Sequence, residues 1–439
     1  MATRTDVFSK LVRDFARPDP LVVQSTTPLA KTVGQMATEK RSAAVVADAD
    51  GGVAGLVTEQ DIVRRVALRA DGGQPTADVM SAPVATIGAD EYLYYAVARM
   101  RRLGYRHMPV VGGDGRLLDE GLPALEIQAL LTHVNNDIYR RIVARSAAEM
   151  EAEGLGAAPV DFAVIVMGSG GRGENYVHPD QDNGFIIDDY PDDAHTAIDG
   201  WFIELATRMT RRLDHAGLPL CEGFVMATNP LWRKRRAEWA MQTTLWSQRR
   251  KAATLRHCDI FFDFRCAYGR ADFADELRAH ITRLAKGNEP LLRAMCDSGA
   301  GPGPGLGWFG RFRTVSEPEE YRGHLNLKHG GSLPLVTGMR LLALREGIPA
   351  ASTLARMAAL AAAGLLTRDD HDELASAYRF MSRLLLKQQL ADFDAGRKVT
   401  NFVHPGTLTR HETQELEQAF RAVTKFSERV RFEFMGEVY

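Results

Sequence analysis

Cysteine is scarce in this sequence, and no two cysteines stand at the spacing of a metal or redox motif. The 439 residues contain only four, at positions 221, 258, 266 and 296. The absence of a C-x-x-C pair excludes a zinc knuckle and a thioredoxin-like redox motif. We therefore expect scattered, reduced thiols, as in a protein of the cytoplasm.

An excess of charge and a long apolar run are also absent. Lys and Arg number 54 against 56 Asp and Glu, a formal net charge of −2, which excludes a dedicated nucleic-acid coat protein or a polybasic membrane binder. The stretch MATRTDVFSKLVRDFARPDP lacks the apolar core of a signal peptide. The run LARMAALAAAGLL (354–366) is too short to span a bilayer and carries an arginine. We expect a cytoplasmic protein with neither a membrane nor a nucleic acid as its partner.

What the sequence does contain is, first, an internal repeat. In one copy, residues 43–68 have the pattern of an apolar strand, a turn over residues 48–52, a second strand and a helix. Residues 107–131 repeat this order, and a helical stretch precedes each copy, at 29–40 and 93–104. A chain of 439 residues favours about three domains, and the repeat accounts for the first part of it.

The repeat resembles a tandem pair of cystathionine-β-synthase-type (CBS) domains over roughly residues 17–133, with copies at about 17–73 and 78–133. CBS pairs often bind adenosyl ligands, and GLVTEQD matches their signature. The resemblance therefore implies that Thr58 meets a phosphate and Asp61 the ribose hydroxyls of an AMP- or ATP-type ligand. The second copy lacks both residues. The alternative is that Thr58 only caps a helix and Asp61 stabilises its first turn.

Hydrophobic periodicity continues beyond the repeat. Residues 124–152 have the spacing of one long helix, and the stretch EAEGLGAAP (151–159) ends it. Strands and helices then alternate from residue 160 to about 288. The expected strands are 161–167, 184–188, 221–227 and 259–268, and the expected helices lie near 194–216, 231–252 and 271–286.

The glycines of GSGGRG (168–173) satisfy the G-x-G-x-x-G pattern of a dinucleotide-binding turn. That fold needs a helix directly after the glycines. Here the proline-containing stretch ENYVHPDQDN follows, which is too short for a parallel crossover. Strands 161–167 and 184–188 are therefore predicted to pair antiparallel. DQDNG also fails as a calcium-binding EF-hand loop, because its glycine comes one place early and Pro191 stands where the loop needs glutamate.

Asp180 and Asp182 point to a different chemistry. Alternate residues of a strand face the same side, so Asp180-x-Asp182 at the start of a strand presents two carboxylates together. Mg²⁺ favours one or two carboxylates together with substrate phosphates. Gly168, Ser169 and Gly170 allow close backbone approach to those phosphates. The pattern predicts a metal-dependent nucleotidyl-transfer site that uses Mg²⁺ or Mn²⁺ and an NTP.

This pattern resembles the signature of the nucleotidyltransferase superfamily of DNA polymerase β. The run GSGGRGENYVHPDQDNGFII is similar to one branch, which holds the PII-protein uridylyltransferases and the DUF294 nucleotidyltransferases with attached CBS domains. The stretches GFVMATNPLWR (223–233), FFDFRCAYG (261–269) and LNLKHGGSLPLV (325–336) resemble the DUF294 group too. The resemblance implies that Asp180 and Asp182 hold the metals and catalyse transfer, while Gly168, Ser169 and Gly170 bind the nucleotide.

The fold class that these observations imply is α+β and multidomain. After the CBS pair, a linker helix is expected over 134–157 and a polymerase-β-like mixed sheet with helices over 158–298. The stretch GAGPGPGLG (299–307) is a second break, and the chain has a helical pattern beyond residue 335. By resemblance, residues 308–439 form a mainly helical, substrate-binding domain.

Three further residues have implied roles at the site. The superfamily generally uses a third carboxylate, as a metal ligand or as a base. Asp263 is included among the catalytic residues for this reason, with Glu222 as the open alternative. Arg172 either pairs with a phosphate of the nucleotide or holds Glu174. Lys328, just ahead of the helical domain, is implied to reach the nucleotide.

The sequence leaves two functions open. The first is an enzyme that moves a nucleoside monophosphate from an NTP to a protein or small-molecule acceptor, regulated by an adenine nucleotide at the CBS pair, in a homodimer. The second is a catalytically weak, nucleotide-sensing signal-transduction module. A basic stretch over 232–239 either draws in triphosphate or RNA, with Trp232 and Trp239 stacking, or is a surface whose tryptophans lie in the core; the second interpretation is favoured.

Overall fold

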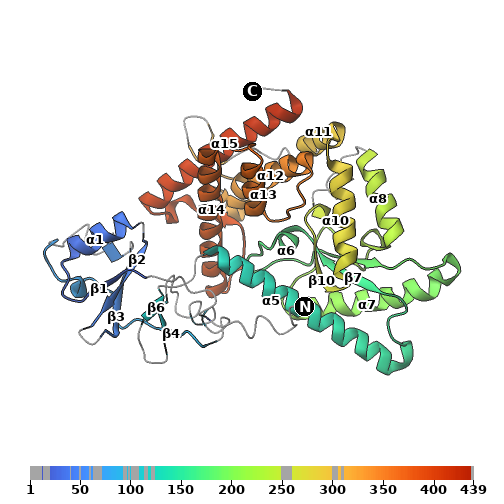
Figure 1. The fold of residues 1–439 in the computed structure, drawn as a ribbon, viewed down its shortest axis with the longest axis horizontal. Helices are drawn as coiled ribbons and strands as arrows, with labels where there is room; N and C mark the ends of the chain where they lie inside the picture. The colour runs from blue at the N-terminus through green and yellow to red at the C-terminus, as the bar shows by residue number, and fades with distance from the viewer. Residues whose placement is uncertain are drawn as a thin grey trace. The chain divides into compact units, whose positions relative to one another are not determined.

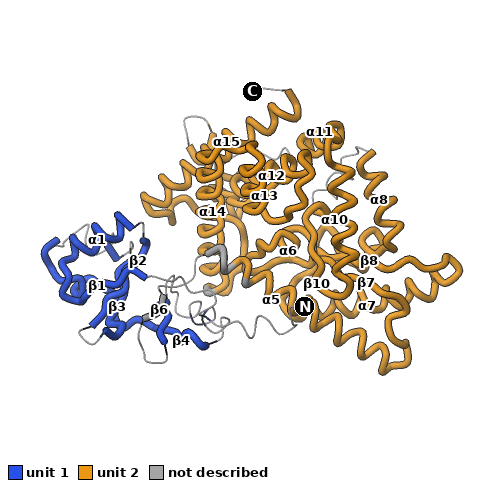
Figure 2. Tube along the Cα trace, in the orientation of Figure 1, with its two compact units in different colours: residues 1–127 blue, residues 128–439 orange. Residues whose placement is uncertain are grey.

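The protein is described by a computed structural model, in which two compact units divide the chain, residues 1–127 and 128–439 (Figure 2). Among the described residues, no helix is both long and apolar enough to cross a membrane. The structure describes residues 12, 20–39, 41–48, 51–58, 61, 62, 72–91, 96, 99, 108–112, 117–119, 124–248, 260–298, 305–307 and 311–436.

The first unit contains two small sheets with the same topology (Figure 1). In each, the first strand pairs parallel with the second, which pairs antiparallel with the third. Leu29 and Met36 of helix α1 (Leu29–Thr38) join the core of the first sheet with Val46 and Val57. The strand pattern of the repeat is thus confirmed in both copies, while most of the helix expected over 93–104 lies outside the described residues. The strands are β1 (Val22–Gln24), β2 (Ala43–Ala47), β3 (Val53–Thr58), β4 (Ile87–Gly88), β5 (Val110–Val111) and β6 (Leu117–Asp119).

The second unit is built on a four-stranded mixed sheet in the order β10-β7-β8-β9. Strand β7 pairs antiparallel with β10 and with β8, and β8 pairs parallel with β9. The antiparallel pairing predicted from the short connection after the glycines is confirmed. The strands are β7 (Phe162–Val166), β8 (Asn183–Ile187), β9 (Arg233–Arg235) and β10 (Arg265–Gly269).

Helices cover both faces of this sheet. On one face, Tyr139 of α5 and Phe202 of α7 pack with Phe162 and Phe185 of the strands. On the other, the indole Nε1 of Trp239 in α8 donates to the Phe185 carbonyl at 2.9 Å. Because both faces are covered, β7 and β8 are buried at every position instead of alternating. The helices are α5 (Ala124–Met150), α7 (His195–His215), α8 (Arg236–Gln248) and α10 (Ala271–Ala285).

Three predicted elements differ from the structure. Residues 221–227 form a loop instead of a strand, because Asn183 uses their backbone: its N–H donates to the Val225 carbonyl (2.9 Å) and its Oδ1 accepts from the Ala227 N–H (3.0 Å). The strand predicted over 259–268 begins only at β10. The helix predicted over 231–252 begins only at Arg236, because a 3-10 turn (Pro230–Trp232) and β9, made extended by pairing with β8, precede it.

The basic stretch that opens this helix is largely neutralised. Trp232 and Trp239 are both 0% exposed, so they lie in the core, as favoured above. Arg233 pairs with Asp199 at 2.8 Å and Arg235 with Asp192 at 2.7 Å. Residues 249–251, which continue the basic pattern, lie outside the described residues.

The rest of the second unit is helical, and the helical pattern predicted beyond residue 335 is confirmed. Helices α12 and α15 approach closely, since a Cβ on Gly338 would lie 2.5 Å from a ring atom of Phe426. Helix α15 begins with a capping box between Thr409 and Glu412. The elements are α11 (Glu289–Ser298), α12 (Leu333–Glu346), α13 (Thr353–Ala362), α14 (Arg368–Asp394) and α15 (Arg410–Met435), with strands β11 (Leu325–Asn326) and β12 (Phe402–Val403).

Candidate active site

The glycine loop directly follows β7 and forms a single helical turn, α6 (Gly168–Arg172). Gly168 has φ +58°, and a Cβ there would lie 2.7 Å from Oδ2 of Asp182. A Cβ on Gly171 would lie 2.0 Å from the backbone carbonyl oxygen of Asp263. Only glycine fits at either position, so the loop is glycine-rich because its backbone touches the residues around it.

Asp180 and Asp182 lie immediately before β8 and not within it. The Asp182 carbonyl accepts from the Met167 N–H at 2.9 Å, which fixes the pair beside the glycine loop. One ligand atom each from Asp180, Asp182 and Cys221 lies within 4.8 Å of the others. Oδ1 of Asp182 is buried and has no hydrogen-bond partner among the described residues. A buried carboxylate oxygen without a partner, beside a second carboxylate, fits a divalent cation.

Burial and nearby charges shift the pKa of Asp182. Burial and the neighbouring Asp180 carboxylate raise the pKa of Asp182 to about 7, against the opposing effects of the Cys221 thiol and of Lys328. Lys328 is exposed and opens the irregular helical turn Lys328–Ser332. Its charge thus acts on the Asp182 carboxylate, and the contact of Lys328 with a nucleotide stays a prediction.

Replacing Asp182 by asparagine should stabilise the metal-free protein at pH 8, by about 4 kcal/mol. In the wild type, the unfolded state releases this proton near pH 3.8 but the folded state holds it to about pH 7. Stability therefore falls as pH rises between these values, and the asparagine variant avoids that loss. Thermal unfolding in EDTA checks this.

The exposed Asp193→Asn, in the turn before α7, serves as the control and should change the melting temperature little at any pH. Equal stability of wild type and Asp182→Asn at pH 8 would contradict the burial of a charged Asp182. Added Mn²⁺ should stabilise the wild type more at pH 8 than at pH 6, because the proton and the metal compete for one carboxylate.

The third member of the cluster is a thiol, Cys221. Burial and the charge of Asp182 raise the pKa of Cys221 to about 12, so the metal-free site holds a neutral thiol. Thiols are poor ligands for Mg²⁺, which favours oxygen. Glu222 is exposed and is not part of the cluster, although it follows Cys221 directly. The described metal cluster therefore contains two carboxylates and not three.

Asp263 lies elsewhere, in a buried ion cluster that joins the sheet to the C-terminal helices. It is 0% exposed, and its carboxylate accepts from Arg340 at 2.6 Å, from Arg356 at 2.6 Å and from Arg172 at 2.9 Å. Burial alone would raise the pKa of Asp263, but the three guanidinium charges hold it well below its usual range. With both oxygens engaged, Asp263 cannot also serve as metal ligand or base, which corrects the expected catalytic role.

The side chain of Arg172 is committed to the same cluster. Its Nε donates to Glu174 Oε2 at 2.6 Å and its Nη1 to Asp263, and the side chain is only 12% exposed. Burial opposes the charge, but the two carboxylates still raise the pKa of Arg172. The nucleotide-binding role expected for Arg172 is therefore replaced by its alternative, holding Glu174.

The segment between the glycine loop and Asp180 is held by contacts that the sequence did not reveal. Glu174 Oε1 accepts from the Thr353 N–H at 2.6 Å, and the Val177 N–H donates to Gln389 Oε1 at 3.1 Å. On the other side, the Asn175 N–H donates to Thr132 Oγ1 of α5 at 3.0 Å. Helices α5, α13 and α14 therefore set the conformation of this segment.

A pocket opens between α5, the glycine loop and the carboxylates. Its walls include Asp180, Asp182 and Ser169, whose Oγ donates to Asn175 Oδ1 at 3.1 Å. Helix α5 adds Asn136 and Tyr139, neither of which was predicted to line the site. The signal was present, because an Asn-Asn pair at 135–136 interrupts an apolar helical stripe.

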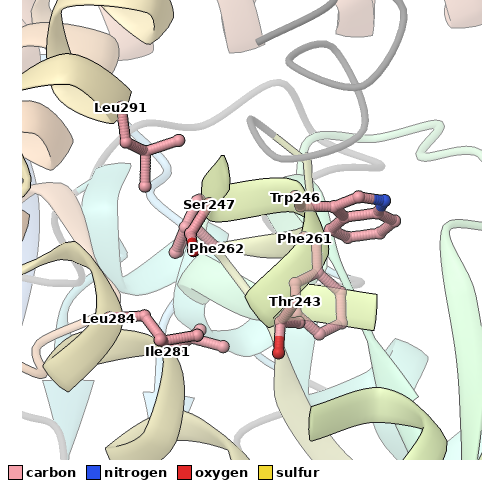
Figure 3. Close-up of a pocket in the computed structure, with 8 residues that line it drawn as sticks. All are labelled: Thr243, Trp246, Ser247, Phe261, Phe262, Ile281, Leu284 and Leu291. Atoms are coloured by element: carbon pink, nitrogen blue, oxygen red, sulfur yellow. The ribbon is translucent and has the colours of Figure 1, made fainter. Parts of the chain in front are cut away.

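A second pocket of similar size is apolar. Figure 3 shows Trp246, Phe261 and Phe262 around it, with Ile281, Leu284 and Leu291. Thr243 and Ser247 contribute hydroxyl groups, but among its lining residues none is titratable. This pocket therefore has no group for proton transfer or metal binding, in contrast to the pocket at the carboxylates.

In the first unit, the CBS candidates Thr58 and Asp61 contact each other. Thr58 Oγ1 donates to Asp61 Oδ2 at 2.7 Å, and the Asp61 N–H donates back to Thr58 Oγ1 at 3.2 Å. Asp61 Oδ1 accepts from Ser81 Oγ at 2.9 Å. The two side chains are thus brought together, in the reciprocal arrangement of a helix cap.

A glycine turn against two carboxylates at the end of a mixed sheet, in a chain that also carries a paired α/β repeat, defines a class: a nucleotidyltransferase-like domain with a CBS pair. Sequence models of three families match this chain. "Putative nucleotidyltransferase DUF294" matches residues 115–253, "Putative nucleotidyltransferase substrate binding domain" matches 289–434, and "CBS domain" matches 12–68 and 77–119. The chain has the DUF294 architecture with tandem CBS domains, which confirms the resemblance found in the sequence.

Two curated relatives share part of this chain. The Meiotically up-regulated gene 70 protein of Schizosaccharomyces pombe is 32% identical over 153 residues, 33% of this chain and 20% of that protein. An uncharacterized 17.7 kDa protein of Acidianus ambivalens is 28% identical over 106 residues, 24% of this chain and 64% of that protein. The chain thus spans less than two thirds of either relative.

Solved structures similar to this chain cover about a quarter of it. A CBS domain protein from Pyrobaculum aerophilum complexed with AMP is 25% identical, with 25% of this chain and 85% of that chain covered and a TM-score of 0.24. A CBS-domain containing protein from Agrobacterium tumefaciens is 28% identical, with 25% and 89% covered and a TM-score of 0.23.

Proposed function

We propose that this protein transfers a nucleoside monophosphate from an NTP to a hydroxyl group of a protein or small molecule. The observation that carries the proposal is the pair Asp180 and Asp182, whose carboxylates lie close together against the glycine loop, with one buried oxygen of Asp182 lacking a partner. Mg²⁺ or Mn²⁺ fits these oxygens, and a bound metal would neutralise the phosphate charge that develops during transfer.

In the proposed reaction, the residues of this chain bind and orient. The backbone of Gly168, Ser169 and Gly170 faces the triphosphate, and Lys328 supplies a positive charge near it. The acceptor oxygen forms a bond to the α-phosphorus as the bond to the β-phosphate oxygen breaks. Pyrophosphate leaves, and the hydroxyl proton passes to water. This is an in-line displacement, in which positioning supplies much of the catalysis.

The proposal is tested by incubating the protein and Mg²⁺ with α-labelled ATP, GTP, CTP or UTP and a cell lysate that contains acceptors. We expect label to appear in a macromolecule or a small metabolite. No label should appear when EDTA is present from the start. Binding of Mg²⁺–NTP without transfer of label to any acceptor would favour the sensing module instead. One observation supports that second function: the described metal cluster contains no third carboxylate.

We further propose that an adenine nucleotide at the CBS pair regulates this activity. Support comes from the position of Thr58 at the end of β3 and from its hydrogen bond to Asp61, three residues later. Such a pair offers a hydroxyl for a phosphate and a carboxylate for a ribose diol.

Replacing Asp61 by alanine should weaken AMP binding about tenfold and shift the nucleotide dependence of transfer, without abolishing transfer at saturating NTP. The reason is that the variant loses the ribose acceptor but leaves the second unit unchanged. Calorimetry with AMP checks the affinity. Glu39→Ala, which removes an exposed acidic side chain of the same unit, is the matched control and should bind AMP as the wild type does. Unchanged AMP affinity in Asp61→Ala would contradict the assignment.

A further inference from the structure

Phe224 has a backbone conformation that its side chain disfavours. Its φ of +55° lies in the left-handed region, and it is the only non-glycine residue with positive φ among the described residues. A phenylalanine rarely adopts this conformation, because its Cβ crowds the following carbonyl. Two hydrogen bonds hold it there: the Phe224 N–H donates to the Cys221 carbonyl at 3.0 Å, and Asn229 Nδ2 donates to the Phe224 carbonyl at 3.2 Å.

Packing of the Phe224 ring does not compensate for this strain. The residue is 69% exposed, more than any other large apolar residue in the described chain, and nearby Leu220 is 51% exposed. A glycine at 224 would relieve the backbone without loss of a core contact. A strained residue kept in place by its surroundings is characteristic of functional sites. We therefore infer that the exposed Phe224 ring binds a ligand.

The loop that carries Phe224 is hydrogen-bonded to the residues on both sides of Asp182. The Gln181 N–H donates to the Pro219 carbonyl at 3.0 Å, and the Asn183 N–H donates to the Val225 carbonyl at 2.9 Å. Within the same loop, the Cys221 sulfur lies within 4.8 Å of ligand atoms of Asp180 and Asp182. The Phe224 N–H is thus hydrogen-bonded to Cys221, a residue of the metal cluster.

We propose that Phe224 is the stacking platform for the nucleobase of the NTP. This inference rests on the proposed function and adds the base-binding element to it. A triphosphate at the carboxylates would extend its ribose and base over the adjoining surface, and an exposed aromatic ring on the loop bonded to these carboxylates offers a face on which any base stacks. Stacking alone reads no hydrogen-bond pattern, so this platform accepts purines and pyrimidines with modest preference.

The test compares two ligands that differ in the base. Mg²⁺–GTP and Mg²⁺–tripolyphosphate are titrated against wild type, Phe224→Gly and Phe224→Trp, and the binding counted is the part that Asp182→Asn abolishes. In Phe224→Gly we expect the Kd for Mg²⁺–GTP to rise about tenfold while the Kd for Mg²⁺–tripolyphosphate stays unchanged. Phe224→Trp should bind Mg²⁺–GTP at least as tightly as the wild type.

Folding is controlled within the same experiment. Phe224→Gly relieves the left-handed strain, so its melting temperature should equal or exceed that of the wild type, and lost affinity cannot come from misfolding. Phe393→Ala, which removes another exposed phenylalanine (66% exposed), should leave both Kd values unchanged. Equal Mg²⁺–GTP affinity in wild type and Phe224→Gly overturns the inference alone. If the wild type binds neither ligand, both the proposed function and the inference about Phe224 are wrong.

Discussion

Asp182→Asn is expected to abolish the proposed nucleotide transfer, with a loss of about a thousand-fold or more in kcat/KM. The carboxylate is one of two that face the glycine loop, and metal-mediated stabilisation of transferring phosphate charge is worth several kcal/mol. The same substitution should stabilise the metal-free protein at pH 8. Lost transfer in this variant could therefore not be explained by lost folding. Transfer of α-label at saturating Mg²⁺ measures the effect.

Two controls make the result specific. Asp193→Asn removes an exposed carboxylate of the same unit and should retain full transfer. Asp180→Asn should also lose transfer, since Asp180 is the other carboxylate of the cluster. A fully active Asp182→Asn, with Mg²⁺ still required, would place the metal elsewhere and remove the basis of the site.

Asp263→Asn is expected to destabilise the second unit by about 3–5 kcal/mol, because three buried guanidinium groups lose their shared carboxylate. The cluster joins Asp263 to Arg340 and Arg356 of the C-terminal helices and to Arg172 of the glycine loop. All five tryptophans lie beyond residue 200, so denaturant unfolding followed by tryptophan fluorescence reports on this unit.

The matched control is the exposed pair of Arg270 and Asp272, at 2.6 Å on the surface of the same unit. Asp272→Asn should leave the free energy of unfolding nearly unchanged, because solvent screens that pair. The pKa of Asp263 is depressed, so its stabilising contribution is present above pH 4 and is lost only in strong acid; the Asp263→Asn effect should therefore be constant from pH 5 to 9. Normal stability with lost transfer would instead restore a catalytic role for Asp263.

Local sequence patterns predicted the frame of the site. The apolar strands β7 and β8, the glycines between them and the short polar connection were enough to fix an antiparallel pair with Asp180 and Asp182 at its end. Only glycine satisfies the contacts of Gly168 and Gly171, and that constraint is visible as a glycine-rich stretch. Strand β9 was missed because its three residues become extended only by pairing with β8.

Contacts between distant residues were beyond the reach of these patterns. Asp263 meets Arg340 and Arg356, which lie 77 and 93 residues further along the chain. A conspicuous aspartate in a family-like stretch therefore suggested catalysis, although burial among arginines gives it a structural role. Cys221 reaches the carboxylates from a loop that the sequence predicted to be a strand, so neither its position nor the strain at Phe224 could be foreseen.

The central claim, that this site transfers a nucleoside monophosphate, is tested most directly by the position of the label in the NTP. Wild-type protein is incubated with Mg²⁺, an acceptor-containing lysate and either α-labelled or γ-labelled NTP. We predict label on the acceptor from the α-labelled NTP only, with pyrophosphate released in equal amount, and none with Asp182→Asn. Transfer of the γ-label, or no transfer from any of the four NTPs while Mg²⁺–NTP is bound, would contradict it.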